Sequence, residues 1–328
     1  MKDIKRSAVN EDKRKKIIIV GATGTAQKRT LPALDYNKFR VVAISGRRED
    51  ELSKLCEKYG IDKFFTDENK MAEEFADADI AIIATPPFLH AENIRMLTEK
   101  TKALILCEKP LVSEKKDLEI IRKFCSQDRV YIAHHLRHQN CVSFLKDCIN
   151  NRVFGDVKKV SCVWEFFLSL DAKNTKWKDN AFGVGAGLDV GIHCMDMMLC
   201  LFGLPERIEK EKEWERFCVQ ADHEEIKMFY KGFCADIRVS QSRPIKNNFL
   251  KIEFENAVLQ ADGFFSEKAT ENIKIFDRKG ELLREVLFEN VNPYAREIED
   301  LLEKKQENCT LKEQYELLKM YLEGDSRS

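Results

Sequence analysis

The stretch KIIIVGATGTA, Lys16–Ala26, decides the fold class of this chain. Its four consecutive β-branched residues, Ile17–Val20, predict a short buried strand. Gly21 and Gly24 follow and predict a tight turn, and the next residues, QKRTLPAL, have the apolar spacing of a helix that Pro32 bends. A strand, a glycine turn and a helix in this order form the start of a β-α-β unit.

The same alternation of strands and helices continues to residue 136. Several of the later strands, such as Ile80–Thr85 and Ala103–Glu108, are apolar throughout, which is typical of a parallel sheet with helices on both faces. We therefore predict a Rossmann-type, doubly wound α/β domain over residues 16–136, with the polar residues 1–15 as a flexible tail.

The pattern changes from residue 137. In FLKIEFE, Leu250, Ile252 and Phe254 alternate with charged residues, which predicts half-buried strands of an antiparallel sheet. The segment from Pro293 to Gly324 has the spacing of two amphipathic helices. Residues 137–328 are thus predicted to form an α+β domain with a large, mostly antiparallel open sheet.

Composition excludes several classes of protein. The 328 residues carry 55 Lys and Arg against 56 Asp and Glu, so no basic excess favours nucleic acid or an anionic membrane. No apolar run approaches the roughly 18 residues of a membrane span, and the first residues lack the apolar core of a signal peptide. The cysteine count of 11 is odd, and no pair has C-x-x-C spacing. We expect reduced thiols in a cytoplasmic protein.

The glycine turn has a position suited to a pyrophosphate. It follows a strand and opens a helix, so its backbone N–H groups can face an anion. In the fingerprint G-x-G-x-x-G/A, Gly21 and Ala26 take the first and third places, but Thr23 takes the second and Gly24 is displaced by one. Gly21, Thr23, Gly24, Thr25 and Ala26 are the predicted contacts; an ordinary strand-to-helix turn is the alternative.

The end of the second strand bears on which dinucleotide binds. NAD enzymes usually place a carboxylate there, whereas this chain reads Ser45-Gly46-Arg47-Arg48. Two guanidinium groups suit an adenosine 2′-phosphate, so we predict that NADP(H) is favoured and NAD(H) is the alternative. The opposing interpretation is that both arginines are merely solvated at the start of a helix.

Three further motifs carry a family resemblance. ATPPFLH lies at the end of one predicted strand and extends to His90. CEKP lies at the end of the next strand and extends to Pro110, and GVGAGLDVGIHCMD spans Gly183–Asp196. With the glycine turn, the motifs TPP-x-x-H, EKP and D-x-G-x-H resemble, in order and spacing, the Gfo/Idh/MocA family of oxidoreductases. The resemblance covers nearly the whole chain after the tail. Two departures are Thr23 at the usual middle glycine and GVG at Gly183–Gly185 where the family has GGG.

The resemblance implies roles for individual residues. Lys109 matches the catalytic lysine beside the nicotinamide, His193 the proton acceptor and Asp189 its acidic neighbour. Asp189 and His193 are four apart, so on a helix the carboxylate can orient the imidazole. Arg137 and Trp177 are predicted to join these three residues in binding substrate. Lys109 also belongs to the predicted cofactor cleft, whose other members are Thr85, Pro86, Pro87, His90 and Glu108.

These expectations converge on one activity. We predict an NAD(P)-dependent oxidoreductase that transfers a hydride between a nicotinamide and a hydroxyl or keto carbon of a sugar, cyclitol or nucleotide-sugar. An imine or enone reductase of the same fold and a non-catalytic NAD(P)-sensing protein are the alternatives. His135, His138 and Cys141 have a metal-like spacing, but we predict no metal there. The resemblance also implies that residues 137–328 serve substrate binding and oligomerisation, with a homo-oligomer formed through the C-terminal sheet. We expect no nucleic acid or membrane partner.

Overall fold

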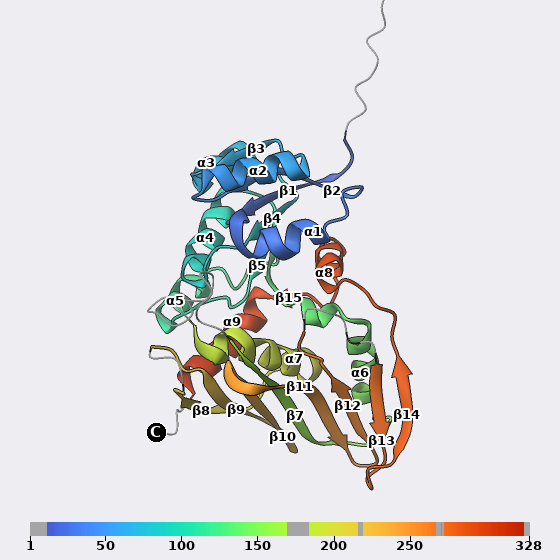
Figure 1. The fold of residues 1–328 in the computed structure, drawn as a ribbon. Helices are drawn as coiled ribbons and strands as arrows, with labels where there is room; N and C mark the ends of the chain where they lie inside the picture. The colour runs from blue at the N-terminus through green and yellow to red at the C-terminus, as the bar shows by residue number, and fades with distance from the viewer. Residues whose placement is uncertain (1–11, 169–183, 216–218, 267–269, 271, 325–328) are drawn as a thin grey trace, which may run out of the picture.

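Two β-sheets organise the chain (Figure 1). The computed structural model describes residues 12–168, 184–215, 219–266, 270 and 272–324. Trp177 therefore lies outside the described residues. Figure 1 shows the first sheet and its helices at the top, the second sheet at the bottom, and helices α7 (Ile192–Phe202) and α9 (Leu311–Glu323) between them.

The first sheet confirms the predicted doubly wound arrangement. Its order is β15-β6-β5-β4-β1-β2-β3, and all pairs are parallel except β15 with β6. Ile17 and Ile19 belong to one hydrophobic core and Ile18 and Val20 to the other, because successive side chains point to opposite faces. The strands are β1 (Lys15–Val20), β2 (Phe39–Ser45), β3 (Lys63–Phe65), β4 (Ile80–Ile83), β5 (Leu104–Glu108), β6 (Val130–Ala133) and β15 (Cys309–Thr310).

Helices connect these strands as the sequence predicts. α2 ends at Gly60, which is left-handed with φ 63°. Gly21, at the start of the glycine turn, is also left-handed with φ 86°, and a Cβ there would lie 2.8 Å from Thr85 N. The turn thus lets β1 and the end of β4 approach closely. The helical segments are η1 (Ala22–Thr30), α1 (Leu31–Ala33), α2 (Glu49–Tyr59), α3 (Glu68–Glu74), η2 (Pro87–Leu89), α4 (His90–Lys100) and α5 (Lys115–Arg122).

The second sheet has the order β14-β13-β12-β11-β7-β10-β9-β8. All of its described pairs are antiparallel except β7 with β10. Leu250, Ile252 and Phe254 are buried, as their alternation predicts. The strands are β7 (Val157–Phe167), β8 (Arg207–Glu213), β9 (His223–Tyr230), β10 (Phe233–Ser240), β11 (Ser242–Phe254), β12 (Val258–Asp262), β13 (Asn272–Phe276) and β14 (Leu282–Leu287). The remaining helical segments here are η3 (His135–His138), α6 (Asn140–Asn150) and η5 (Gly187–Gly191).

The end of the chain returns to the first sheet. Ile298 and Leu301 of α8 (Pro293–Leu302) join the core that contains Ile17 and Ile19, and β15 pairs with β6. A single boundary at residue 137 does not describe this return. The amphipathic pattern of a helix shows which of its faces is buried but not which sheet buries it.

Gly21→Ala should destabilise the protein more than Gly60→Ala. Both glycines are left-handed, but only Gly21 has backbone atoms within 3 Å of the added Cβ, while Gly60 has nothing within 4 Å. We expect Gly60→Ala to lower the free energy of unfolding by about 1 kcal/mol and Gly21→Ala by about 1–3 kcal/mol more. Urea denaturation measures both. Equal losses would show that the close approach to Thr85 is not constrained.

Candidate active site

His90 connects two of the predicted motifs behind the cleft. Its ring nitrogens lie 2.8 Å from the carbonyl oxygen of Thr85 and 2.9 Å from that of Pro110, and the side chain is fully buried. The Lys109–Pro110 peptide bond is cis. His90 therefore ties the TPP and EKP loops together, while Pro86 of the first loop is exposed and Lys109 of the second is 15% exposed.

Lys109 joins the two halves of the molecule. It follows the last residue of β5, and its Nζ donates to the backbone oxygen of Asp189 at 2.7 Å and to Asp189 Oδ1 at 3.2 Å. The two side chains are 15% and 14% exposed. An ion pair this sheltered is screened less by salt than a surface pair. The structure thus brings together two residues that are 80 positions apart.

A residue that sequence reasoning missed holds the other oxygen of Asp189. Gln241, between β10 and β11, donates from Nε2 to Asp189 Oδ2 at 2.6 Å. Nδ1 of His193 is buried without a partner among the described residues, so the Asp189 carboxylate does not hold that nitrogen. No motif marks Gln241, because it occupies a polar connection between two strands.

Three rings surround His193, at the start of α7. Its ring centroid lies 6.0 Å from that of His134, 5.5 Å from that of His135 and 5.5 Å from that of Trp164. His135 stacks in turn on Tyr294 of α8, with centroids 4.1 Å apart. Burial, and then the positive charge of Lys109, holds the pKa of His193 well below its ordinary value of 6.5. The imidazole is therefore neutral at neutral pH and can accept a proton.

Arg137 does not line an open pocket, contrary to the sequence prediction. Its guanidinium is 2% exposed and donates to both carboxylate oxygens of Asp196, at 2.9 and 2.7 Å. His134, Asp196 and Cys309 place potential ligand atoms within 4.8 Å of one another. The charge of Arg137 on both Asp196 oxygens opposes a metal cation there, so we assign none.

The three residues with metal-like spacing after β6, His135, His138 and Cys141, lie in separate surroundings. His138 Nδ1 lies 2.8 Å from Asp300 Oδ2, while His135 stacks on Tyr294. Cys141 is buried, and burial raises the pKa of its thiol to about 12. A thiol so protonated is a poor metal ligand.

The two arginines after β2 have different surroundings. Arg48 donates from Nη2 to the backbone oxygen of Thr23 at 3.0 Å and pairs with Glu51 at 2.7 Å. Arg47 is exposed, and no ion pair engages it within the described part of the chain. Gly24 has open space beside it, since a Cβ there would meet nothing within 4 Å. The turn and Arg47 thus fit a phosphate-bearing dinucleotide.

The other predicted contacts lie around this turn. The backbone N–H of Gly21 donates to the oxygen of Ser45 at 3.0 Å, and that of Gly46 to Phe65 at 3.1 Å. Thr25 is partly buried, whereas Ala26 and Pro87 are buried and support the turn and the TPP loop from inside. These contacts bring the carboxyl ends of β1, β2 and β4 to one edge, where open parallel sheets bind their ligands.

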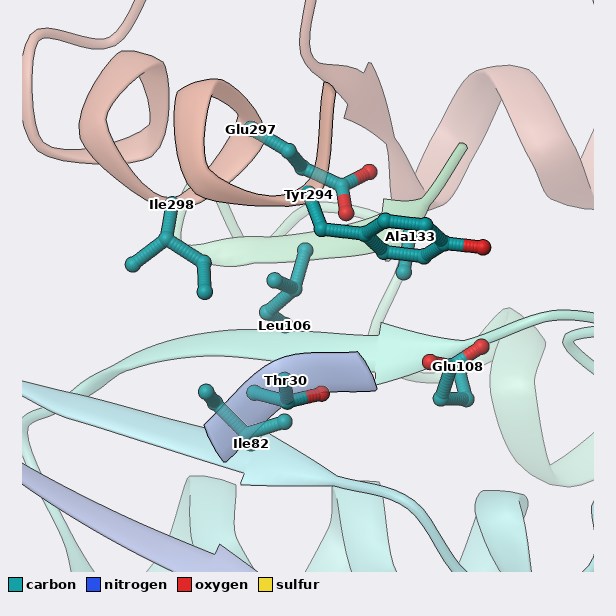
Figure 2. A pocket seen from close by; sticks show the side chains of 8 residues that line it. All are labelled: Thr30, Ile82, Leu106, Glu108, Ala133, Tyr294, Glu297 and Ile298. Carbon is teal, nitrogen blue, oxygen red and sulfur yellow. The ribbon is translucent and has the colours of Figure 1, made fainter. Parts of the chain in front are cut away.

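A small cavity lies under the carboxyl ends of β4, β5 and β6 (Figure 2). Glu297 of α8 is 4% exposed, and its Oε1 has no hydrogen-bond partner in the described part of the chain. Burial, followed by the charge of Glu108, raises the pKa of Glu297 well above 4.5, and burial also raises that of Glu108. The residues around the cavity are Thr30, Ile82, Leu106, Glu108, Ala133, Tyr294, Glu297 and Ile298.

Family models cover most of the chain. Residues 15–134 match the model for an oxidoreductase family with an NAD-binding Rossmann fold, and residues 142–257 match the Gfo/Idh/MocA C-terminal domain. The chain belongs to the Gfo/Idh/MocA family. It is therefore an oxidoreductase whose first sheet is a dinucleotide-binding Rossmann fold.

Individual members of the Gfo/Idh/MocA family are distant. D-xylose 1-dehydrogenase (NADP(+)) 2 of Haloferax volcanii is 23% identical over 286 residues, 86% of each chain. The scyllo-inositol 2-dehydrogenase (NADP(+)) IolU of Bacillus subtilis is 23% identical over 196 residues, 58% of this chain and 59% of the relative. No described helix is long and apolar enough to cross a membrane.

Solved structures show the same fold. An aldose-aldose oxidoreductase from Caulobacter crescentus has a TM-score of 0.80 at 18% identity, covering 94% of this chain and 95% of its own. A 3-ketoreductase from Actinomadura kijaniata, in complex with NADP and TDP-benzene, has a TM-score of 0.77 at 18% identity, covering 93% and 94%. At such identities the likeness concerns the fold alone.

Glu297→Gln should flatten the fall of stability with rising pH. A carboxyl whose pKa is higher in the folded state binds its proton more tightly there. Its contribution to stability is complete below pH 4.5, the ordinary pKa of Glu, and is lost as the pH rises through the folded-state pKa. Glutamine has no proton to lose. We expect the stability of the variant relative to that of the native protein to rise as the pH increases above 4.5 in urea titrations.

Glu299→Gln, on an exposed position of the same helix, is the matched control. Glu299 pairs with Lys38 at 2.7 Å on the surface. The stability of the Glu299→Gln variant should depend on pH in the same way as that of the native protein. A Glu297→Gln curve that runs parallel to the native one would contradict a buried, neutral Glu297.

Proposed function

We propose that the protein transfers a hydride between NADP(H) and a hydroxyl-bearing carbon of a sugar, cyclitol or nucleotide-sugar. The observation that carries the proposal is the sheltered Lys109–Asp189 pair near a neutral His193, beside the carboxyl edge of the Rossmann sheet. Alcohol oxidation needs a base for the O–H proton and a positive charge for the oxygen, and these residues supply both.

The nicotinamide, when bound, supplies the hydride acceptor. The neutral imidazole of His193 takes the hydroxyl proton, and the electron pair of that O–H bond closes the C=O bond as the C–H bond releases its hydride. The ammonium of Lys109 stabilises the negative charge that develops on the oxygen. Asp189 holds Lys109 in place through two of its own oxygens. In the reverse direction the same groups return the proton to a ketone.

NADP(H) is proposed over NAD(H) because Arg47 has the properties of a phosphate ligand. It is exposed and outside every described ion pair, whereas Arg48 is already bound to the glycine turn and to Glu51. Two of the relatives are named as NADP(+) enzymes. The substrate class is supported by their names too, which include xylose and inositol.

We further propose a cytoplasmic homo-oligomer. All ten cysteines in the described ranges are free thiols, as expected in a reducing compartment. Ion pairs such as Lys159–Asp236 and Lys251–Glu253 cover the outward face of the second sheet. An interface built on that face is therefore polar, and its strength should fall with salt.

Lys109→Ala should lower kcat by about 100-fold or more. The ammonium that stabilises the reacting oxygen is lost, while Arg47 and the glycine turn are untouched. Affinity for NADP(H), measured by calorimetry, should stay within about threefold of the native value. Lys102→Ala, at an exposed position just before the same strand, is the control. Turnover of Lys109→Ala close to the native rate would contradict the proposed mechanism.

Arg47→Ser and Arg48→Ser should have different effects on the cofactor. Loss of Arg47 should weaken the binding of NADPH by about tenfold or more and leave the binding of NADH nearly unchanged, because only NADPH carries the 2′-phosphate. Loss of Arg48 should weaken the binding of both cofactors, since the bond from Arg48 to Thr23 supports the glycine turn. Fluorescence titration with each cofactor separates the cases, and an equal response of NADPH and NADH to Arg47→Ser would contradict the assignment.

A further inference from the structure

Gln241 is a rigid, buried side chain that touches the catalytic pair. It is 1% exposed and follows the last residue of β10. Its backbone N–H donates to the oxygen of Asp222 at 2.8 Å, and its backbone oxygen accepts from Leu168 N at 2.8 Å. These bonds hold the backbone on both sides, and burial together with the bond to Asp189 Oδ2 restricts the side chain.

The carboxylate of Asp189 decides which way the Gln241 amide faces. Asp189 Oδ2 accepts the 2.6 Å bond from Gln241 Nε2, and an ionised carboxylate has no proton to donate. The amide nitrogen must therefore face Asp189, and the carbonyl oxygen Oε1 faces away from it. Gln241 Oε1 is buried and has no hydrogen-bond partner among the residues that the structure describes. Most buried acceptors in proteins do have one, so this oxygen calls for a donor.

Among the described residues, the ammonium of Lys109 contacts the same carboxylate as Gln241 and is already engaged. Lys109 Nζ is bound to the backbone oxygen and Oδ1 of Asp189. A hydroxyl group of the substrate is a suitable donor, and polyols carry several. Resting on the proposed function, we infer that Gln241 Oε1 accepts a hydrogen bond from a second substrate hydroxyl, on the carbon next to the reacting one. Gln241 then selects vicinal diols over alcohols that lack this neighbouring hydroxyl.

The size of the expected selectivity follows from the unsatisfied oxygen. A site built to bond a substrate hydroxyl rejects the analogue without it strongly, because the buried partner is left without a donor. An apolar side chain of similar length at position 241 removes this oxygen, and with it the bond to Asp189 Oδ2, on every substrate alike. A missing substrate hydroxyl then leaves no buried acceptor at position 241 without a donor. Selectivity, more than overall activity, is therefore the property that depends on this oxygen.

The experiment compares Gln241→Met with the native protein on paired substrates. A panel beginning with D-xylose and scyllo-inositol, each with NADP+, is assayed beside the analogues that lack the hydroxyl next to the reacting carbon. We expect the native protein to prefer the hydroxylated member by about 100-fold or more in kcat/KM, and Gln241→Met to reduce this ratio at least about tenfold. NADP(H) affinity should remain unchanged.

Gln139→Met is the matched control, because Gln139 is also buried with one unpartnered amide atom. The ratio of kcat/KM between the two members of each substrate pair should be the same for Gln139→Met as for the native protein. A Gln241→Met variant that slows both substrates of a pair equally shows a merely structural role and overturns the inference. No oxidation of any panel member by the native protein overturns the proposed function itself, whereas native turnover without selectivity overturns only the role of Gln241.

Discussion

The bond from Lys109 to Asp189 is the interaction on which the site depends. Lys109 directly follows β5 of the Rossmann sheet, and Asp189 lies in η5, over the second sheet. Each end is fixed by its own surroundings. His90 holds the EKP loop through Pro110, and Gln241 holds Asp189 through its second oxygen. The proposed catalytic pair is thus assembled only when the two sheets are in place.

The environment of His193 gives this pair its chemistry. A neutral imidazole beside a positive ammonium has no tendency to bind a proton before substrate arrives. Behind it, the Arg137–Asp196 ion pair is fully buried. A buried charge without its partner is costly, so this pair constrains how η3 and α7 pack. The polar residues near the site therefore divide into those that meet substrate and those that fix the helices.

Sequence reasoning predicted the local elements and the motif residues but missed the long-range partners. The β-branched run at Ile17–Val20 and the alternation at Leu250–Phe254 report burial directly, because the signal lies within each segment. Lys109, Asp189 and His193 were singled out through the family resemblance of the motifs that contain them. Gln241 and Glu297 carry no local signal, since their importance comes from residues far away in the chain. Arg137 was expected in the cleft because nothing in its neighbourhood reveals the bond to Asp196.

Direct hydride transfer is the central claim, and isotope transfer tests it most directly. The native protein is incubated with NADP+ and a polyol substrate deuterated at the carbon that is oxidised, and the mass of the NADPH formed is measured. Deuterium should appear in the NADPH, because the C–H bond releases its hydride directly to the nicotinamide. NADPH that forms without deuterium, or deuterium that appears in the solvent, would contradict the account.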